Sequence, residues 1–333
     1  MTIRDVEVVI DRRTQSVSQT GFGTPLILAS TKDHPFTTYS TIEALSADFD
    51  ESTGIYKRAN RIFSQNPRPE KIAVLGVAYD SETADPTAFT TTLNDNAQKD
   101  FYFLFCEVET QAVVQELSGW AEANKKLYFF NSDDPSIHGT LQSDYTVAAL
   151  HTDAESYLAE GWVGVCAPQD PGSITWKFKT ITGITEADYS ASEIDEIVED
   201  GGNTYIRQGG VLHTYDGRTT SGEWIDVIRS QHFIEERIKE SVFQTLVSAP
   251  KVPYDSRGIA MIEVAIESVL KTAFSNGMIA ADDDGQALYS VSTPSRNEIS
   301  STDRKNRVLP DVTFEFELSG AIHKTKIHGV IRV

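Results

Sequence analysis

The chain has 333 residues, of which 29 are basic and 49 acidic, so its formal net charge is −20. Such an acidic surface does not suit a nucleic-acid partner, because neutralising phosphates requires clustered Lys and Arg. The length allows two domains with a core each. No apolar run reaches the roughly 18 residues of a membrane-spanning helix. The opening residues lack the apolar core of a signal peptide, so we expect a soluble protein that is not exported by that route.

The start of the chain alternates apolar and polar residues over 3–10, which predicts a strand with Val6, Val8 and Ile10 on one face. A polar stretch then leads to Gly21-Phe22-Gly23. This Gly-x-Gly precedes a predicted strand, whereas a dinucleotide fingerprint follows one, so we do not expect it to bind phosphate.

From residue 71 onward, apolar runs of strand length alternate with helical patterns. After a strand at 25–30 and helices at 42–47 and 55–65, we expect strands at 72–78, 101–106, 126–130 and 161–166, and helices at 87–99, 110–124 and 145–160. Strands separated by helices of this length predict a parallel sheet with helices packed on it. Many nucleotide-binding enzymes share this fold class, so fold alone does not exclude an enzyme.

Both cysteines, Cys106 and Cys166, lie in apolar runs of this region. We favour buried free thiols over a disulfide, which suits a reducing cytoplasm.

The character of the chain changes after Pro168. Residues 174–179 alternate like a strand, and 186–200 hold seven acidic residues and no basic one, as a solvated helix or loop would. Paired glycines at 201–202 and 209–210 predict a hairpin of two short strands.

Two amphipathic helices follow, over 224–247 and 256–276. The first carries a stripe of Ile234, Ile238, Val242 and Leu246, and the second a stripe of Ile259, Ile262, Ile266, Val269, Leu270, Ala273 and Phe274. Asp255 or Ser256 can cap the second helix, and Gly277 can end it in a left-handed conformation.

The chain closes with extended segments. Residues 290–308 are polar, and the alternation that follows places Val312, Phe314, Phe316 and Leu318 on one face of a strand. Residues 320–333 continue as a second extended run.

No motif that carries chemistry is complete. The run Asp282-Asp283-Asp284-Gly285 lacks calcium ligands at the required positions, Ala280 and Val291. His323 and His328 would point to opposite faces of a strand, so they cannot share a metal. Asp216 and Asp226 could be drawn as paired carboxylates, but a hairpin turn and a helix cap explain them better. We therefore expect no catalytic, cofactor or metal site.

Several ordered blocks resemble the contractile tail sheath proteins of phages and phage-tail-like particles. They are Gly21-Phe-Gly-Thr-Pro-Leu-Ile-Leu, Phe63-Ser-Gln-Asn-Pro-Arg-Pro-Glu-Lys-Ile, Gly201-Gly-Asn-Thr-Tyr, Asp216-Gly-Arg-Thr-Thr-Ser-Gly-Glu-Trp-Ile-Asp, Lys251-Val-Pro-Tyr and Gly258-Ile. The resemblance touches most of the chain.

The resemblance implies a structural subunit, not an enzyme, that polymerises helically around an inner tube and contracts to drive that tube through a target envelope. The implied fold is α/β plus α+β. It consists of an N-terminal strand arm (1–20), a parallel-type α/β domain (21–168), a mixed C-terminal sheath domain (169–309) and a C-terminal strand arm (310–333).

The resemblance also implies partners and a place of assembly. Strands containing Val6, Val8 and Ile10 and Val312, Phe314, Phe316 and Leu318 would complete a sheet between neighbouring subunits. Glu263, Glu267 and Lys271 are candidate tube-facing residues. The partners would be further copies of the chain, the inner tail tube protein, and baseplate and tail-terminator proteins. Assembly would take place in the host cytoplasm, and the product would be a virion tail or an extracellular particle.

Two other functions remain open from the residues alone. One is a small-molecule or nucleotide-binding α/β enzyme, and the other is a ring-forming tail or baseplate component.

Overall fold

A computed structural model describes residues 21–326 apart from 81 and 135. Its largest element is an eight-stranded sheet in the order β2-β3-β1-β4-β5-β6-β7-β8. All neighbours are parallel except the two edge pairs, β2 with β3 and β7 with β8. The strands are β1 (Pro25–Ala29), β2 (Thr37–Tyr39), β3 (Ile72–Gly76), β4 (Phe103–Cys106), β5 (Leu127–Ser132), β6 (Thr146–Leu150), β7 (Asn203–Gln208) and β8 (Val211–Tyr215).

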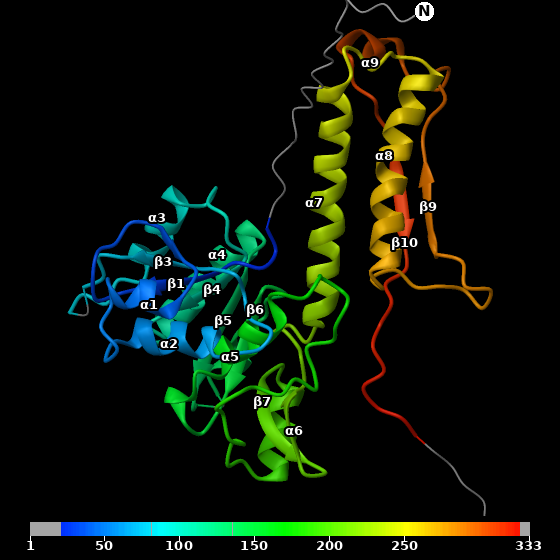
Figure 1. Cartoon of the computed structure of the whole chain (residues 1–333). Coiled ribbons are helices and arrows are strands. Elements are labelled where there is room, and N and C mark those ends of the chain that lie inside the picture. The colour runs from blue at the N-terminus through cyan, green and yellow to red at the C-terminus, as the bar shows by residue number, and fades with distance from the viewer. Residues whose placement is uncertain (1–20, 81, 135, 327–333) are drawn as a thin grey trace, which may run out of the picture.

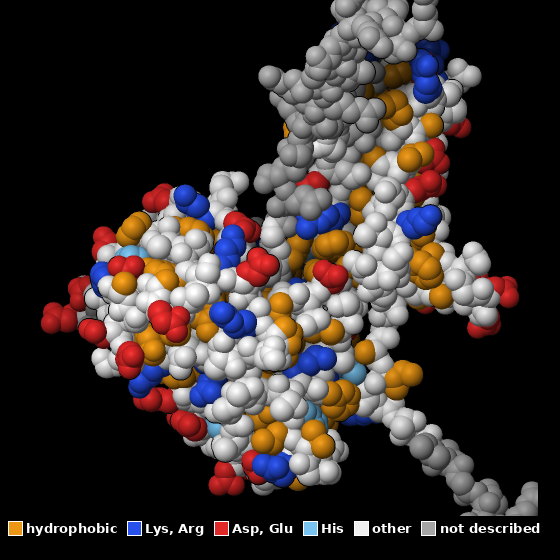
Figure 2. All heavy atoms as spheres, viewed as in Figure 1, with side chains coloured by type: hydrophobic (Ala, Val, Ile, Leu, Met, Phe, Trp, Pro, Cys, Tyr) orange, Lys and Arg blue, Asp and Glu red, His pale blue; other side chains and the backbone are white. Residues whose placement is uncertain are grey.

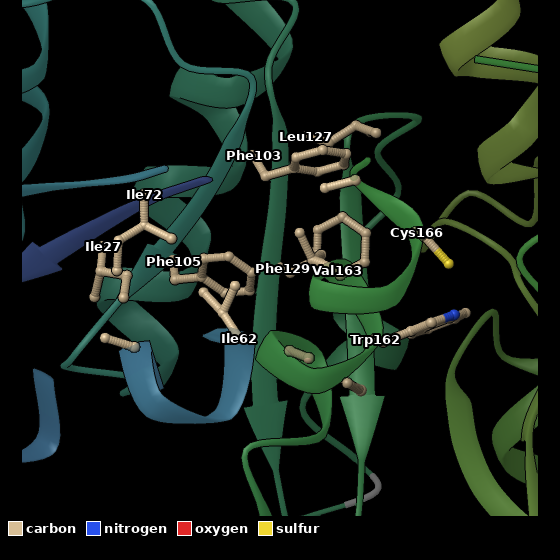
Figure 3. Close-up of a cluster of buried hydrophobic side chains, with 14 of the residues drawn as sticks. Ile27, Ile62, Ile72, Phe103, Phe105, Leu127, Phe129, Trp162, Val163 and Cys166 are labelled. Carbon is tan, nitrogen blue, oxygen red and sulfur yellow. The ribbon is translucent and has the colours of Figure 1, made fainter. Parts of the chain in front are cut away.

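Helices cover both faces of this sheet, because successive side chains of a strand point to opposite sides. Phe103 and Phe105 face α1 (Ile42–Ser46), α2 (Gly54–Phe63) and α5 (Leu158–Cys166). Leu104 and Cys106 face α3 (Thr87–Asp95) and α4 (Gln111–Asn124). Figure 3 shows the first cluster, with Phe105 and Phe129 turned toward Ile62 of α2 and Val163 of α5. The expected parallel α/β architecture is confirmed, and both cysteines are free and buried.

The expected order of elements is wrong over residues 145–166. The predicted helix 145–160 contains strand β6, and the predicted strand 161–166 lies within helix α5. Strand β6 lies between β5 and β7 and is buried on both faces, so its sequence shows no alternation. Gly161 and Gly164 let α5 pack closely, since a Cβ at Gly164 would lie 3.0 Å from the carbonyl oxygen of Ile62.

The sheet continues beyond residue 168, where we expected a domain boundary. Strands β7 and β8 form the predicted hairpin and extend the same sheet, with α6 (Ala191–Glu199) beside them. Helix α6 is largely exposed, as its acidic composition predicted. Residues 174–179 do not form the predicted strand, because only Phe178 and Lys179 make backbone hydrogen bonds to a strand, at Thr214 of β8. The side chain of Trp176 is buried. We call residues 21–224 the α/β body.

The remaining elements form a helical part that stands beside the α/β body (Figure 1). It contains α7 (Ile225–Ser248), α8 (Ser256–Ser275), β9 (Tyr289–Ser292), α9 (Ser301–Asn306) and β10 (Thr313–Phe316). Strands β9 and β10 pair antiparallel and pack on the two long helices. Short 3-10 turns at His138–Thr140 and Ala154–Ser156 complete the described elements. Within the described ranges, no helix is both long and apolar enough to span a membrane.

Candidate subunit-interaction surfaces

Helix α7 joins the α/β body to the helical part without a flexible linker. Its first turns are buried in the body through Ile225, Ile228 and Arg229, and its later turns pack on α8 through Ile234 and Ile238. The two parts are therefore joined by one continuous helix of 24 residues.

Helix α8 begins and ends as the sequence predicted. The carboxylate of Asp255 accepts hydrogen bonds from the backbone N–H groups of Arg257 and Gly258, at 3.0 and 3.1 Å. Gly277 has a φ of +79° and follows the last turn, where Met278 donates to the carbonyl of Ala273. The turn before α8 also requires glycine at 258, because a Cβ there would lie 1.8 Å from the carbonyl oxygen of Pro253.

The small sheet of β9 and β10 has an unpaired edge on each strand within the described residues. Val312 and Phe316 pack on the α7–α8 core, whereas Phe314 remains 39% exposed. Leu318 forms an isolated bridge to Ile279. A two-stranded sheet is marginal alone, and an unpaired edge offers a template to another strand. Val6, Val8 and Ile10 lie outside the described residues.

An apolar groove of about 450 Å³ runs beside β10, between the two long helices. Its lining is mostly aliphatic and includes Val242 and Leu246 of α7, Ile259 and Ile262 of α8, and Phe314. Outside this lining, Phe243 in the last turns of α7 is 55% exposed. Figure 2 shows such hydrophobic side chains reaching the surface of the helical part. The apolar stripe of α7 runs past the residues that α8 covers, but the sequence pattern alone does not predict this groove.

The three candidate tube-facing residues share one side of α8, but they differ in their surroundings. Glu267 and Lys271 are exposed. Glu263 is half-buried, and its carboxylate accepts a 3.1 Å hydrogen bond from the hydroxyl of Thr293.

The carboxyl ends of the parallel strands, where open α/β sheets bind ligands, are filled by the chain's own side chains. Arg58 of α2 pairs with Glu160 and, at 2.6 Å, with Glu109. Asn131 donates its backbone N–H to Glu109 at 2.8 Å and its side-chain amide to Glu160 at 2.9 Å. Burial raises the pKa of Glu109 although Arg58 opposes it. Because the single cation, Arg58, is already paired with two carboxylates, this site does not suit the binding of a phosphate.

The acidic residues considered as calcium ligands or paired carboxylates take part in local structure. The carboxylate of Asp282 accepts the N–H groups of Asp284 and Gln286, which closes a turn. Asp216 is buried and paired with Lys177 and with Arg218, so it is more than a turn residue.

The other residues considered are not brought together either. Asp226 lies in the first turn of α7, where burial raises its pKa, and the cap position belongs to Trp224. His323 contacts the α/β body, and His328 lies outside the described residues.

Comparisons with known proteins agree with this geometry. Residues 225–330 match the family model described as E217 tail sheath protein gp31-like, C-terminal domain. No curated protein sequence matches the chain.

Solved structures match over nearly the whole chain. The helical sheath of the anti-feeding prophage in the contracted state has a TM-score of 0.71 at 15% identity, covering 100% of this chain and 99% of the other. The PVC sheath complex of an extracellular contractile injection system, also contracted, has a TM-score of 0.70 at 9% identity, covering 99% and 98%. A sheath tail protein from Desulfitobacterium hafniense has a TM-score of 0.62 at 9% identity, covering 86% and 93%.

The match of residues 225–330 and the fold of the whole chain confirm the resemblance seen in the sequence: residues 225–330 match the model of a tail sheath C-terminal domain, and the chain has the fold of contractile sheath proteins.

Proposed function

We propose that this chain is the subunit of a contractile sheath, which polymerises helically around an inner tube and shortens to drive the tube through a target envelope. The observation that carries the proposal is the likeness to a contracted helical sheath over the full length of both chains. The energy for contraction would be stored in contacts between subunits. Such contacts must be heterologous, so that they build a helix and do not close into a ring.

The small sheet is the proposed joint between subunits. Strand β10 offers a free edge, and the groove beside it can bury apolar side chains. The N-terminal arm of a neighbouring copy, with Val6, Val8 and Ile10, would add a strand there by β-augmentation. Joints of this kind can hold while the bodies rotate, because the backbone hydrogen bonds lie within the sheet.

The exposed face of α8 is the proposed contact with the tube. Glu267 and Lys271 would make weak, solvent-screened contacts. The carboxylate of Glu263, which already accepts a hydrogen bond from Thr293, would add to them. Weak contacts suit a surface that must release the tube during contraction. By the same proposal, the sheath ends on baseplate and tail-terminator proteins. It assembles in the host cytoplasm and becomes part of a virion tail or an extracellular particle.

Electron microscopy of the purified chain, alone and with its tube protein, tests the proposal. We expect long hollow cylinders with helical symmetry. Closed rings would favour a ring-forming baseplate component. Discrete particles whose melting temperature rises saturably with a nucleotide would favour the enzyme, because a ligand of the folded state stabilises it by mass action.

A further inference from the structure

The segment that follows β10 returns from the helical part to the α/β body. In Figure 1 it runs, in red, from the end of β10 along the body. Residues 320–326 form no helix or strand, yet the imidazole of His323 lies on the body. Its Nε2 is 2.7 Å from the hydroxyl oxygen of Thr175.

Two aromatic rings of the body enclose the imidazole. The ring of Trp224 meets it edge to face, with centroids 4.4 Å apart and planes at 80°. Phe178 meets it at 6.0 Å and 87°. Thr175 and Phe178 come from the loop before α6, and Trp224 comes from the start of α7, so two separate segments converge on one side chain.

The rest of the segment stays outside. Ile322 is 87% exposed, and Lys324 is exposed on the other side of His323. Among residues 320–326, only His323 has its side chain substantially covered. His323 is therefore the side chain through which this segment meets the body.

We propose that Thr175, Phe178 and Trp224 form a docking site for the chain's own C-terminal segment, with His323 as the side chain that the site binds. The segment is anchored at its other end by Leu318, which bridges to Ile279, and by Ser319, which donates to the carbonyl of Met278. The docked segment is therefore a further tie, beside α7, between the helical part and the α/β body. Release of His323 leaves α7, and Met278 lying against Gly172 of the body, as connections among the described residues.

The charges around the docking site make the tie sensitive to pH. Lys177 and Arg218 are positive, Asp216 is negative and pairs with both, and Lys324 adjoins His323 in the chain. His213 of β8 packs on Phe178 at 5.2 Å. Burial first, and then Lys177, lower the pKa of His323, while Asp216 opposes them.

The direction of the pH effect follows from that lowered pKa. A free histidine titrates at about pH 6.5, so protonation favours the undocked segment. The equilibrium constant for docking is greatest above that pH and falls by up to about tenfold per pH unit below it.

A nitroxide label on Ile322→Cys in the full chain measures docking directly, because its spectrum separates an immobilised segment from a mobile one. Cys106 and Cys166 do not compete for the label, since both are buried and burial raises their pKa. We expect an immobilised spectrum at about pH 7.5 and a mobile one at about pH 5. The additional change His323→Ala should give the mobile spectrum at both pH values.

Two further variants make the result specific. His323→Phe keeps an aromatic ring but gains no proton, so docking should no longer depend on pH; a pH response in this variant would assign the effect to another group and overturn the role of His323. Trp224→Ala should mobilise the label at about pH 7.5, with circular dichroism confirming that the body is folded.

Equal spectra of the parent and of His323→Ala at about pH 7.5 would overturn the docking site. The measurement uses unpolymerised subunits, so its outcome is independent of whether the chain builds a sheath.

Discussion

The guanidinium of Arg229 donates a 3.1 Å hydrogen bond to the backbone carbonyl of Phe22, 207 residues earlier in the chain. Two longer bonds, of 3.4 Å, reach the carbonyls of Cys166 and Gln169. The side chain is buried, and burial lowers its pKa. These bonds hold the first turns of α7 against the start of β1 and the end of α5, so they set the direction in which the helical part leaves the α/β body.

Arg229→Ala should therefore destabilise the protein strongly. The change removes three charge-assisted bonds and leaves buried carbonyls unpaired, which together cost about 3 kcal/mol of the free energy of unfolding. Urea denaturation followed by tryptophan fluorescence measures the loss. Arg207→Ala is the control, because Arg207 pairs with Glu186 in solvent and its loss should lower the free energy of unfolding far less. Equal losses in the two variants would contradict the role of Arg229.

Two helical glycines form a matched pair for a packing test. A Cβ at Gly164 of α5 would lie 2.8 Å from Cγ of Gln65 and 3.0 Å from the carbonyl oxygen of Ile62, whereas a Cβ at Gly119 of α4 would meet nothing within 4 Å. Gly164→Ala should lower the free energy of unfolding by about 1–3 kcal/mol through overpacking. Gly119→Ala should raise it by about 0.5–1 kcal/mol, since alanine favours a helix. The two melting temperatures should move in opposite directions, and a rise for both would show that α5 can retreat from α2.

The parts of the fold that the sequence predicts are those that local physics decides. The caps of α8 at Asp255 and Gly277 follow from hydrogen bonding and backbone conformation at single residues. The apolar stripes of α7 and α8 follow from helical periodicity. Strand β6 cannot be predicted in this way. A strand buried on both faces shows no alternation of apolar and polar residues, and its alanines also suit a helix.

The candidate surfaces were predicted only in part, because they depend on which segments meet. The alternation around Phe314 predicts strand β10, but its partner β9 begins at Tyr289, at the edge of a stretch that reads as polar. The apolar stripe of α7 does not predict that the first turns of the helix pack in the α/β body and its later turns in the helical part. The sequence presents His323 only as a possible metal ligand, since nothing in its neighbours along the chain points to Trp224.

Stability should fall as the pH drops from about 7.5 to about 5, in part through His232. This histidine of α7 is hydrogen-bonded to the hydroxyl of Tyr102 at 2.7 Å, and burial, with a smaller contribution from Lys125, lowers its pKa to about 4. Because the unfolded chain binds the proton more strongly, the stabilisation is complete above about pH 6.5 and is lost as the pH falls toward 4. The loss by pH 5 is on the order of 2 kcal/mol.

The variant His232→Asn isolates this contribution. Its free energy of unfolding should change less between the two pH values than that of the parent chain, because His138 and His323 titrate in both proteins. An unchanged pH dependence would show that His232 binds protons equally in the folded and the unfolded chain over this range.

Exchanging the charges of Glu267 and Lys271 tests the tube contact. The double change Glu267→Lys with Lys271→Glu keeps the net charge, and both residues are exposed, so the melting temperature should stay nearly constant. Assembly on the tube should decrease, as seen by counting tube-bound sheaths in electron micrographs. Glu263 is left unchanged because it accepts a hydrogen bond from Thr293. Normal assembly on the tube would exclude this face of α8 as the contact.

Proline at position 314 tests the free edge of β10. Glu317 donates its N–H to the carbonyl of Leu288, and in an antiparallel pair the bonding direction alternates, so the N–H of Phe314 points to the unpaired edge. Phe314→Pro removes that donor without breaking a bond to β9, and an edge strand tolerates proline. The subunit should stay folded while cylinders become rare or short.

Phe314→Ala controls for the lost aromatic ring, which also lines the groove. If the backbone of this edge joins one subunit to the next, cylinders should form with the alanine variant in greater number and length than with the proline variant. Should both variants polymerise alike, the link between subunits does not run through the free edge of β10. Should neither polymerise, the ring of Phe314 in the groove, rather than the hydrogen-bonded edge, would hold the neighbour.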